Sequence, residues 1–134
     1  MNHQVESIVS RIKIVLEDRV EFALLFGSVL TENFADESDI DCAAYFKEPP
    51  KSFSDRAQLI IDLEDALQKK FDMIFLNSSD IIITMQVLAN GELVINNDPG
   101  KFVVYKAQKI SEYIDFKKSR KIIEDSMLRG RIYA

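Results

Sequence analysis

The sequence predicts one α/β (α+β) domain in which a small mixed sheet of about four strands is covered by helices. Three observations support this prediction: short apolar runs alternate with segments of helical periodicity, the 134 residues suit a single domain, and 47% of them are hydrophobic. We therefore expect residues 1–134 to form one domain with its own core.

Strands are expected where short apolar runs are bounded by charged or turn-forming residues. These runs are residues 22–26, 40–46, 72–76 and 92–95. Polar or proline-containing loops are expected at residues 34–38, 47–52 and 96–100, because paired prolines suit neither a helix interior nor a central strand.

Helices are expected where apolar residues recur at intervals of three and four. These segments are residues 5–17, 28–33, 53–70, 81–89 and about 101–129. Residues 77–79 are expected to cap the fourth of these helices. The long last helix carries one apolar stripe, formed by Val103, Ala107, Ile110 and Ile114. Part of this stripe can pack on the sheet, and the remainder can form an interface with a partner.

Composition excludes several classes of protein. No apolar run approaches the 18 residues that a transmembrane helix needs, and residues 1–10 lack the features of an export signal. Cys42 is the only cysteine, so no internal disulfide can form, which fits a cytoplasmic protein. With 17 basic and 22 acidic residues, the chain disfavours direct nucleic-acid binding and better suits a basic protein partner.

Gly27 and Ser28 follow the first expected strand directly. At a strand-to-helix turn, glycine lets the backbone approach a phosphate, and the serine hydroxyl and free N–H groups can donate hydrogen bonds to it. The pair therefore indicates a phosphate-binding turn, although an ordinary turn contains the same residues.

Asp39 and Asp41 stand at the start of the second expected strand. Residues i and i+2 of a strand share a face about 6.5–7 Å apart, and two such charges repel by about 2.5 kcal/mol at an effective dielectric near 20. A bound divalent cation would offset this repulsion. The alternative is a solvated edge or loop.

Asp72 heads the third expected strand. If that strand lies beside the second, three carboxylates share one patch, which suits Mg²⁺ bound together with substrate phosphates. A surface residue or a cap of the preceding helix is the alternative.

Together, the strand, Gly27-Ser28, the ten-residue spacing, Asp39-x-Asp41 and Asp72 resemble the polymerase-beta-type nucleotidyltransferase superfamily. The closest resemblance is to the minimal nucleotidyltransferases (MNT), the MntA-like antitoxins of HEPN/MNT toxin–antitoxin systems. Residues 24–28 and 38–41 match the motif core, and residues 85–94 and the last helix resemble the rest of the family.

The resemblance implies an activity and a partner. MNT antitoxins transfer AMP from ATP onto a tyrosine hydroxyl of a cognate HEPN-domain RNase toxin, release pyrophosphate and so neutralise the toxin. It implies that Gly27 and Ser28 bind the nucleotide and that Asp39 and Asp41 hold two Mg²⁺ ions. Asp72 would complete one metal site and help to deprotonate the hydroxyl. A hetero-oligomer with the toxin is implied, with no part for nucleic acid or membrane.

One position departs from the family pattern. Family members often carry a second acid shortly after the third aspartate, where this chain has Phe75. Asp72 alone would then serve at this end of the site.

Two other functions stay open. The chain could be an antitoxin that blocks its partner by binding alone, with weak or no catalysis. It could also be a small-molecule nucleotidyltransferase of aminoglycoside-modifying type, although such enzymes add a helical domain and only residues 96–134 follow the last expected strand here.

Other candidate residues have simpler interpretations. Cys42 is expected in the core rather than as a nucleophile, and Tyr105 and Tyr113 are expected in the core or an interface rather than as self-modification sites. The basic run at residues 117–121 is expected on a solvated helix face, or against an acidic partner surface or a phosphate.

Overall fold

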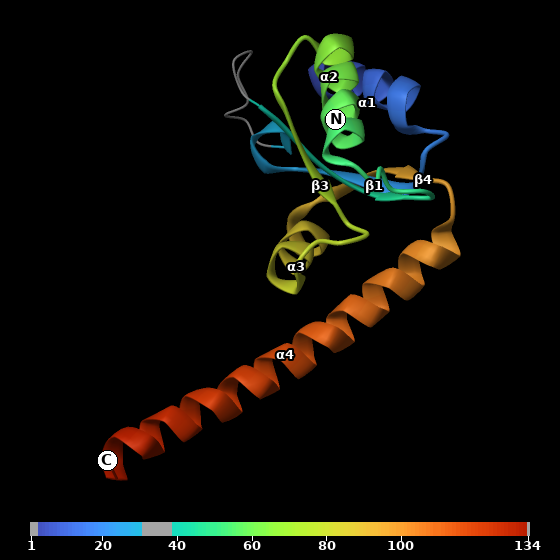
Figure 1. Cartoon of the computed structure of the whole chain (residues 1–134). Helices are drawn as coiled ribbons and strands as arrows, with labels where there is room; N and C mark the ends of the chain where they lie inside the picture. The colour runs from blue at the N-terminus through green and yellow to red at the C-terminus, as the bar shows by residue number, and fades with distance from the viewer. Residues whose placement is uncertain (1–2, 31–38, 134) are drawn as a thin grey trace.

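The computed structural model describes residues 3–30 and 39–133 and shows an α/β domain from which one long helix extends (Figure 1). Its elements are, in chain order, α1 (His3–Leu16), β1 (Val20–Phe26), the 3-10 turn η1 (Gly27–Leu30), β2 (Ile40–Phe46), α2 (Phe53–Leu67), β3 (Phe71–Phe75), α3 (Ile81–Asn90), β4 (Glu92–Asn96) and α4 (Pro99–Tyr133). The expected loop at residues 34–38 and the end of the expected helix at 28–33 lie outside the described residues.

The four strands form one mixed sheet in the order β3-β2-β1-β4. β1 pairs antiparallel with both β2 and β4, whereas β2 and β3 are parallel. The parallel pair is possible because α2 provides the crossover connection between the two strands. This arrangement confirms the predicted fold class.

Helices cover both faces of the sheet, with α1 and α2 on one face and α3 and the start of α4 on the other (Figure 1). Alternation along the strands supplies a separate apolar cluster to each face. On β2, for example, Cys42 packs in the cluster beneath α1 and α2, and its neighbour Ala43 packs toward α3 and α4.

Helix ends differ from the sequence predictions by a few residues, and at two of them the capping contacts give the reason. α2 ends at Leu67 rather than at residue 70, because Gln68 adopts a left-handed conformation (φ 54°) and its N–H donates to the Glu64 carbonyl. α3 is capped by Asp80, whose side chain accepts from the Ile83 N–H, and not by residues 77–79. Asn77 instead pairs with the backbone of Phe46 at the end of β2.

Aromatic side chains attach α4 to the sheet. Tyr105 is buried, its hydroxyl donates to the Leu76 carbonyl at 2.9 Å, and its ring contacts Phe22 and Tyr45. The stripe expected from the sequence faces away instead: Val103 is 64% exposed, and Ile110 and Ile114 are also exposed. Beyond these turns, α4 extends away from the domain (Figure 1).

Among the described residues, no helix combines the length and the apolar character needed to cross a membrane.

Candidate functional site

Strand alternation places Asp41 and Asp72 on the α3 face of the sheet. Ile40 and Cys42, on either side of Asp41, pack in the cluster beneath α1 and α2. Phe71 and Met73 flank Asp72 in the same way. Because successive side chains of a strand point to opposite faces, both carboxylates point toward the side of the sheet that carries α3.

The strand register brings the two carboxylates together. Asp41 lies opposite Asp72 in the parallel β2–β3 pair and opposite Phe26 in the antiparallel β1–β2 pair. Asp41 therefore stands between the end of β1 and the start of β3. Neighbouring strands lie about 4.8 Å apart, so Asp41 and Asp72 are direct cross-strand neighbours.

Asp39 lies one residue before β2 and is exposed. Its charge is close enough to act on Asp41. The pKa of the Asp41 carboxyl is raised by burial first, then by the charge of Asp72 and a side-chain hydrogen bond with it, and then by the charge of Asp39. All three predicted acids thus belong to one electrostatic cluster.

Gly27 follows β1 directly and lies against the Asp41 carboxylate. Its φ of +78° is in the left-handed region, where a side chain is strained. A Cβ at this position would overlap the Asp41 carboxylate oxygen and lie 3.2 Å from the carboxylate carbon. The turn therefore needs glycine for two reasons. Because glycine has no side chain, the backbone at Gly27 stays accessible beside the Asp41 carboxylate. Ser28, the next residue, is half-buried in η1.

The donor set fits Mg²⁺ in its chemistry. Carboxylate oxygens are the ligands that this cation prefers. A cation would also relieve the repulsion by Asp72 and Asp39 that adds to the effect of burial in raising the pKa of Asp41. Among the described residues, no three acidic, histidine or cysteine side chains are already gathered around one point as metal ligands. Rotation of the carboxylates about their side-chain bonds would have to complete such a site.

A hollow of about 350 Å³ adjoins Gly27, between the sheet and α3. Its lining comes from the end of β1, from β3 and from one face of α3: Phe26, Gly27, Ile74, Ile83, Gln86, Val87 and Asn90. The sequence did not single out the α3 residues, because nothing distinguishes Gln86 or Asn90 there from ordinary helix-surface residues. The hollow places open space directly beside the turn that is expected to bind phosphate.

Phe75 lies on the opposite face from Asp72. It packs with the cluster beneath α1 and α2, where its ring stacks on Phe46 at 5.4 Å between centroids, and Arg56 lies over it. The departure from the family pattern is therefore a packing residue and removes no group from the carboxylate cluster.

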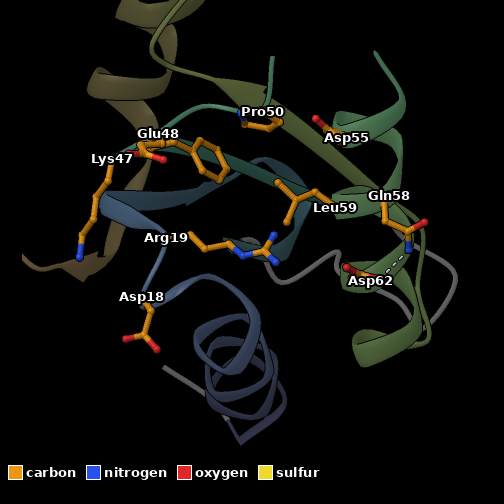
Figure 2. Close-up of a pocket in the computed structure, with 10 residues that line it drawn as sticks. Asp18, Arg19, Lys47, Glu48, Pro50, Asp55, Gln58, Leu59 and Asp62 are labelled. Carbon is orange, nitrogen blue, oxygen red and sulfur yellow. Dashed lines mark hydrogen bonds between the residues drawn. The ribbon is translucent and has the colours of Figure 1, made fainter. Parts of the chain in front are cut away.

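A second hollow, of about 590 Å³, lies at the other end of the strands (Figure 2). It is lined by residues just before β1, just after β2 and along α2, with the Arg19 side chain reaching toward Leu59. Because Asp41 and Asp72 stand at the starts of β2 and β3, this hollow is separate from the carboxylate cluster.

Comparison with protein-family models matches residues 10–100 to the model described as "Polymerase beta, Nucleotidyltransferase". This range contains all four strands, Gly27, Ser28 and the three aspartates. No curated protein matches the chain.

Several solved structures share the fold. A chain of a toxin–antitoxin crystal structure with AMP-PNP is 24% identical, with a TM-score of 0.76, over 90% of this chain and 98% of that one. A chain of the tri-AMPylated Shewanella oneidensis HEPN toxin in complex with MNT antitoxin is 23% identical, with a TM-score of 0.74, over 92% and 98%. A chain of an MntA-HepT toxin–antitoxin structure is 22% identical, with a TM-score of 0.73, over 92% and 98%.

Proposed function

Because this chain belongs to the polymerase beta nucleotidyltransferase family, we propose that it is an antitoxin that transfers AMP from ATP to a tyrosine hydroxyl of a cognate HEPN-domain RNase toxin. The transfer would neutralise the toxin. One observation carries the proposal: the register of the sheet sets Asp41 beside Asp72, and Gly27 lies against the same carboxylate.

The reaction divides into defined bond changes. The tyrosine oxygen attacks the α-phosphorus of ATP, the bond from that phosphorus to the bridging oxygen breaks, and pyrophosphate leaves. The phenolic proton passes to a nearby base. We assign Asp72 to this role because it is exposed at the start of β3, where an incoming hydroxyl can reach it.

The turn after β1 would hold the triphosphate. Gly27 has no side chain to keep a phosphate away, and the hollow beside it gives space for the nucleotide. Ser28 would donate its hydroxyl to a phosphate oxygen. Asp39, Asp41 and Asp72 would hold two Mg²⁺ ions, which neutralise phosphate charge and favour departure of pyrophosphate.

Similar folds in toxin–antitoxin complexes support the partner and the nucleotide. The neighbours include a structure with AMP-PNP and one whose HEPN toxin is tri-AMPylated. The bound AMP-PNP and the AMPylated toxin are properties of those neighbours, and the experiment below tests AMP transfer by this chain.

The direct test combines this chain, the HEPN protein encoded beside it, labelled ATP and Mg²⁺. We expect AMP on a tyrosine of the HEPN protein, located by peptide mass spectrometry, and loss of its RNase activity. Chelation of the metal with EDTA should abolish the label. An unlabelled HEPN protein, with both proteins folded, would overturn the enzymatic proposal.

The double variant Asp39→Asn/Asp41→Asn separates transfer from simple binding. We expect it to bind the HEPN protein but to leave the RNase active at catalytic doses. The variant Asp55→Asn/Asp65→Asn makes the same charge change on the exposed face of α2 and should label normally. If the first variant neutralises the RNase at an equimolar dose, binding alone suffices.

A further inference from the structure

The outer half of α4 has no cover within the described chain. Every side chain from Lys117 to Arg129 is exposed, including Ile122, Ile123, Met127 and Leu128, which are 55–67% exposed. An isolated helix of this length is marginal in water unless an apolar face is packed against something. A partner that packs against the outer half of α4 would therefore stabilise this part of the helix.

The charge of the chain is divided between α4 and the rest. From Pro99 onward the sequence has nine basic and four acidic residues, whereas residues 1–98 have eight basic and eighteen acidic ones. The net charges are thus +5 and −10. The overall value of −5 hides a basic helix attached to a strongly acidic domain.

A hollow of about 630 Å³ lies where α4 passes α3. Apolar and aromatic side chains, four cations and two acids line it: Ile82, Tyr113, Phe116, Lys117, Lys118, Arg120, Lys121, Glu124 and Asp125. Arg120 is already paired with Glu124 at 3.0 Å, and Lys117 lies over the Tyr113 ring. Lys118 and Lys121 have no such partner among the described residues.

This hollow and the hollow beside Gly27 both include a residue from the first turn of α3. Ile82 lines the hollow against α4, and the next residue, Ile83, lines the hollow beside Gly27. Both isoleucines are about two-fifths exposed, at 39% and 40%. A polypeptide that covers both isoleucines would bury apolar surface and would lie next to the hollow beside Gly27.

We propose that the α3–α4 hollow and the exposed outer half of α4 form the docking surface for the acceptor protein, which presents an acidic segment with apolar side chains. The inference rests on the proposed function and names the surface that selects its substrate. Acidic groups of the segment would pair with Lys118 and Lys121, while its apolar groups cover Ile82 and Phe116.

A protein segment fits this surface better than a nucleic acid. Glu124 and Asp125 lie in the hollow itself, and residues 1–98, which contribute only Ile82 to it, have a net charge of −10, so the adjoining domain would repel a phosphate backbone. The exposed isoleucines and Met127 add apolar area that a duplex or a phosphate chain would not cover.

The test measures affinity for the HEPN protein by calorimetry without ATP, so that catalysis plays no part. For Lys118→Glu/Lys121→Glu we expect Kd to rise by about tenfold or more, which corresponds to ~1.4 kcal/mol. The matched control Lys47→Glu/Lys51→Glu makes the same charge change in an exposed loop after β2 and should leave Kd within about twofold. Removing the apolar groups with Ile123→Ser/Met127→Ser should also weaken binding.

Transfer kinetics give a second readout. The lysine variant should raise KM for the HEPN protein and leave kcat nearly unchanged, because the carboxylates are untouched. Wild-type Kd in both the lysine and the apolar variants would overturn the docking surface even if AMP transfer occurs. Absence of transfer by the wild type, with binding still weakened by the variants, would instead overturn the proposed function.

Two other occupants have distinct signatures. If the lysine variant loses affinity for a fluorescent RNA oligonucleotide but binds the HEPN protein normally, the surface is a nucleic-acid site and the proposal is wrong. If sedimentation shows a dimer of this chain that the apolar variant dissociates, and binding of the HEPN protein is unaffected, the surface joins two copies and the proposal is equally wrong.

Discussion

Asp41 and Asp72 lie directly opposite each other on the parallel strands β2 and β3. Backbone pairing fixes this position, so the Cα atoms of the two residues cannot separate without a shift of the whole strand register. The apolar neighbours of Asp41 fix the register in turn, because a one-residue slip would turn Ile40 and Cys42 out of the core. The fold thus holds two like charges together at a cost that a bound cation would offset.

Replacing Asp41 with asparagine should stabilise the metal-free protein at pH 7. The pKa of Asp41 in the folded state is raised above its unfolded value of 3.8. Ionisation of this carboxyl therefore lowers the free energy of unfolding as pH rises from about 3.8 through the folded pKa. Like charges opposite each other on neighbouring strands cost roughly 0.2–1 kcal/mol. Urea denaturation in EDTA should show a gain of this size at pH 7, and the gain should shrink below the unfolded pKa.

The same variant should respond differently to metal. Mg²⁺ should raise the melting temperature of the wild type, since a ligand that binds only the folded state stabilises it, and should raise that of Asp41→Asn much less. An equal rise in both proteins would contradict a metal site at Asp41.

Gly27→Ala should damage both stability and nucleotide binding. The left-handed backbone at Gly27 costs an alanine about 1–2 kcal/mol, and the new Cβ would displace the Asp41 carboxylate. Denaturation and titration with a fluorescent ATP analogue measure the two effects. Gly100→Ala is the matched control: its Cβ would lie 3.6 Å from the nearest atom, in the first turn of α4, so it should be neutral or slightly stabilising. Equal behaviour of the two variants would contradict the prediction.

Tyr105→Phe should lower stability by about 1 kcal/mol, because the Leu76 carbonyl loses its hydrogen bond in a buried position. Burial raises the pKa of Tyr105 from 10.0 to about 12. Between these values the unfolded chain loses the proton and the folded protein keeps it, so stability falls as pH rises. The wild type should therefore lose its advantage over the variant as denaturation is measured from pH 10 toward 12. Tyr113→Phe, on the half-buried ring farther along α4, is the matched control at pH 7 and should change stability less than Tyr105→Phe.

The Cys42 thiol should be unreactive in the folded protein. The residue is fully buried, and burial raises the pKa of the thiol to about 12, so almost no thiolate forms at pH 8. Ellman's reagent should react slowly in buffer and completely in urea. A Cys42→Ala/Ser78→Cys protein, with its thiol at an exposed position before α3, should react at once in buffer. Fast reaction of native Cys42 would contradict the packing of β2.

The sequence predicts the limits of β2 correctly because residues 40–46 are apolar except for Asp41 and are bounded by Asp39 and Lys47. It also predicts that Asp39 and Asp41 share a face. It could not provide the parallel pairing that brings in Asp72, since strand order depends on contacts between residues far apart in the chain. The roles of Gly27, Ser28 and the aspartates in catalysis stay predictions.

Helix faces and ends were harder to predict. α4 has two apolar faces, and the sequence favoured the one with Val103, whereas Phe102 and Tyr105 pack on the sheet. Aromatic side chains bury more area per residue than aliphatic side chains, which explains why the face with Phe102 and Tyr105 packs on the sheet. α2 was predicted too long because no glycine marks its end: Gln68 takes the left-handed conformation that glycine usually supplies.

The 35 residues of α4 form a rod about 50 Å long at 1.5 Å per residue, and only its first turns are anchored to the sheet. If the acceptor docks on the outer half of α4, the helix sets the distance between the docked segment and the candidate site. The protein would then select a hydroxyl by its distance from the docked segment rather than by the residues around that hydroxyl. Shortening α4 by whole turns would then change which hydroxyl is modified, rather than whether modification occurs.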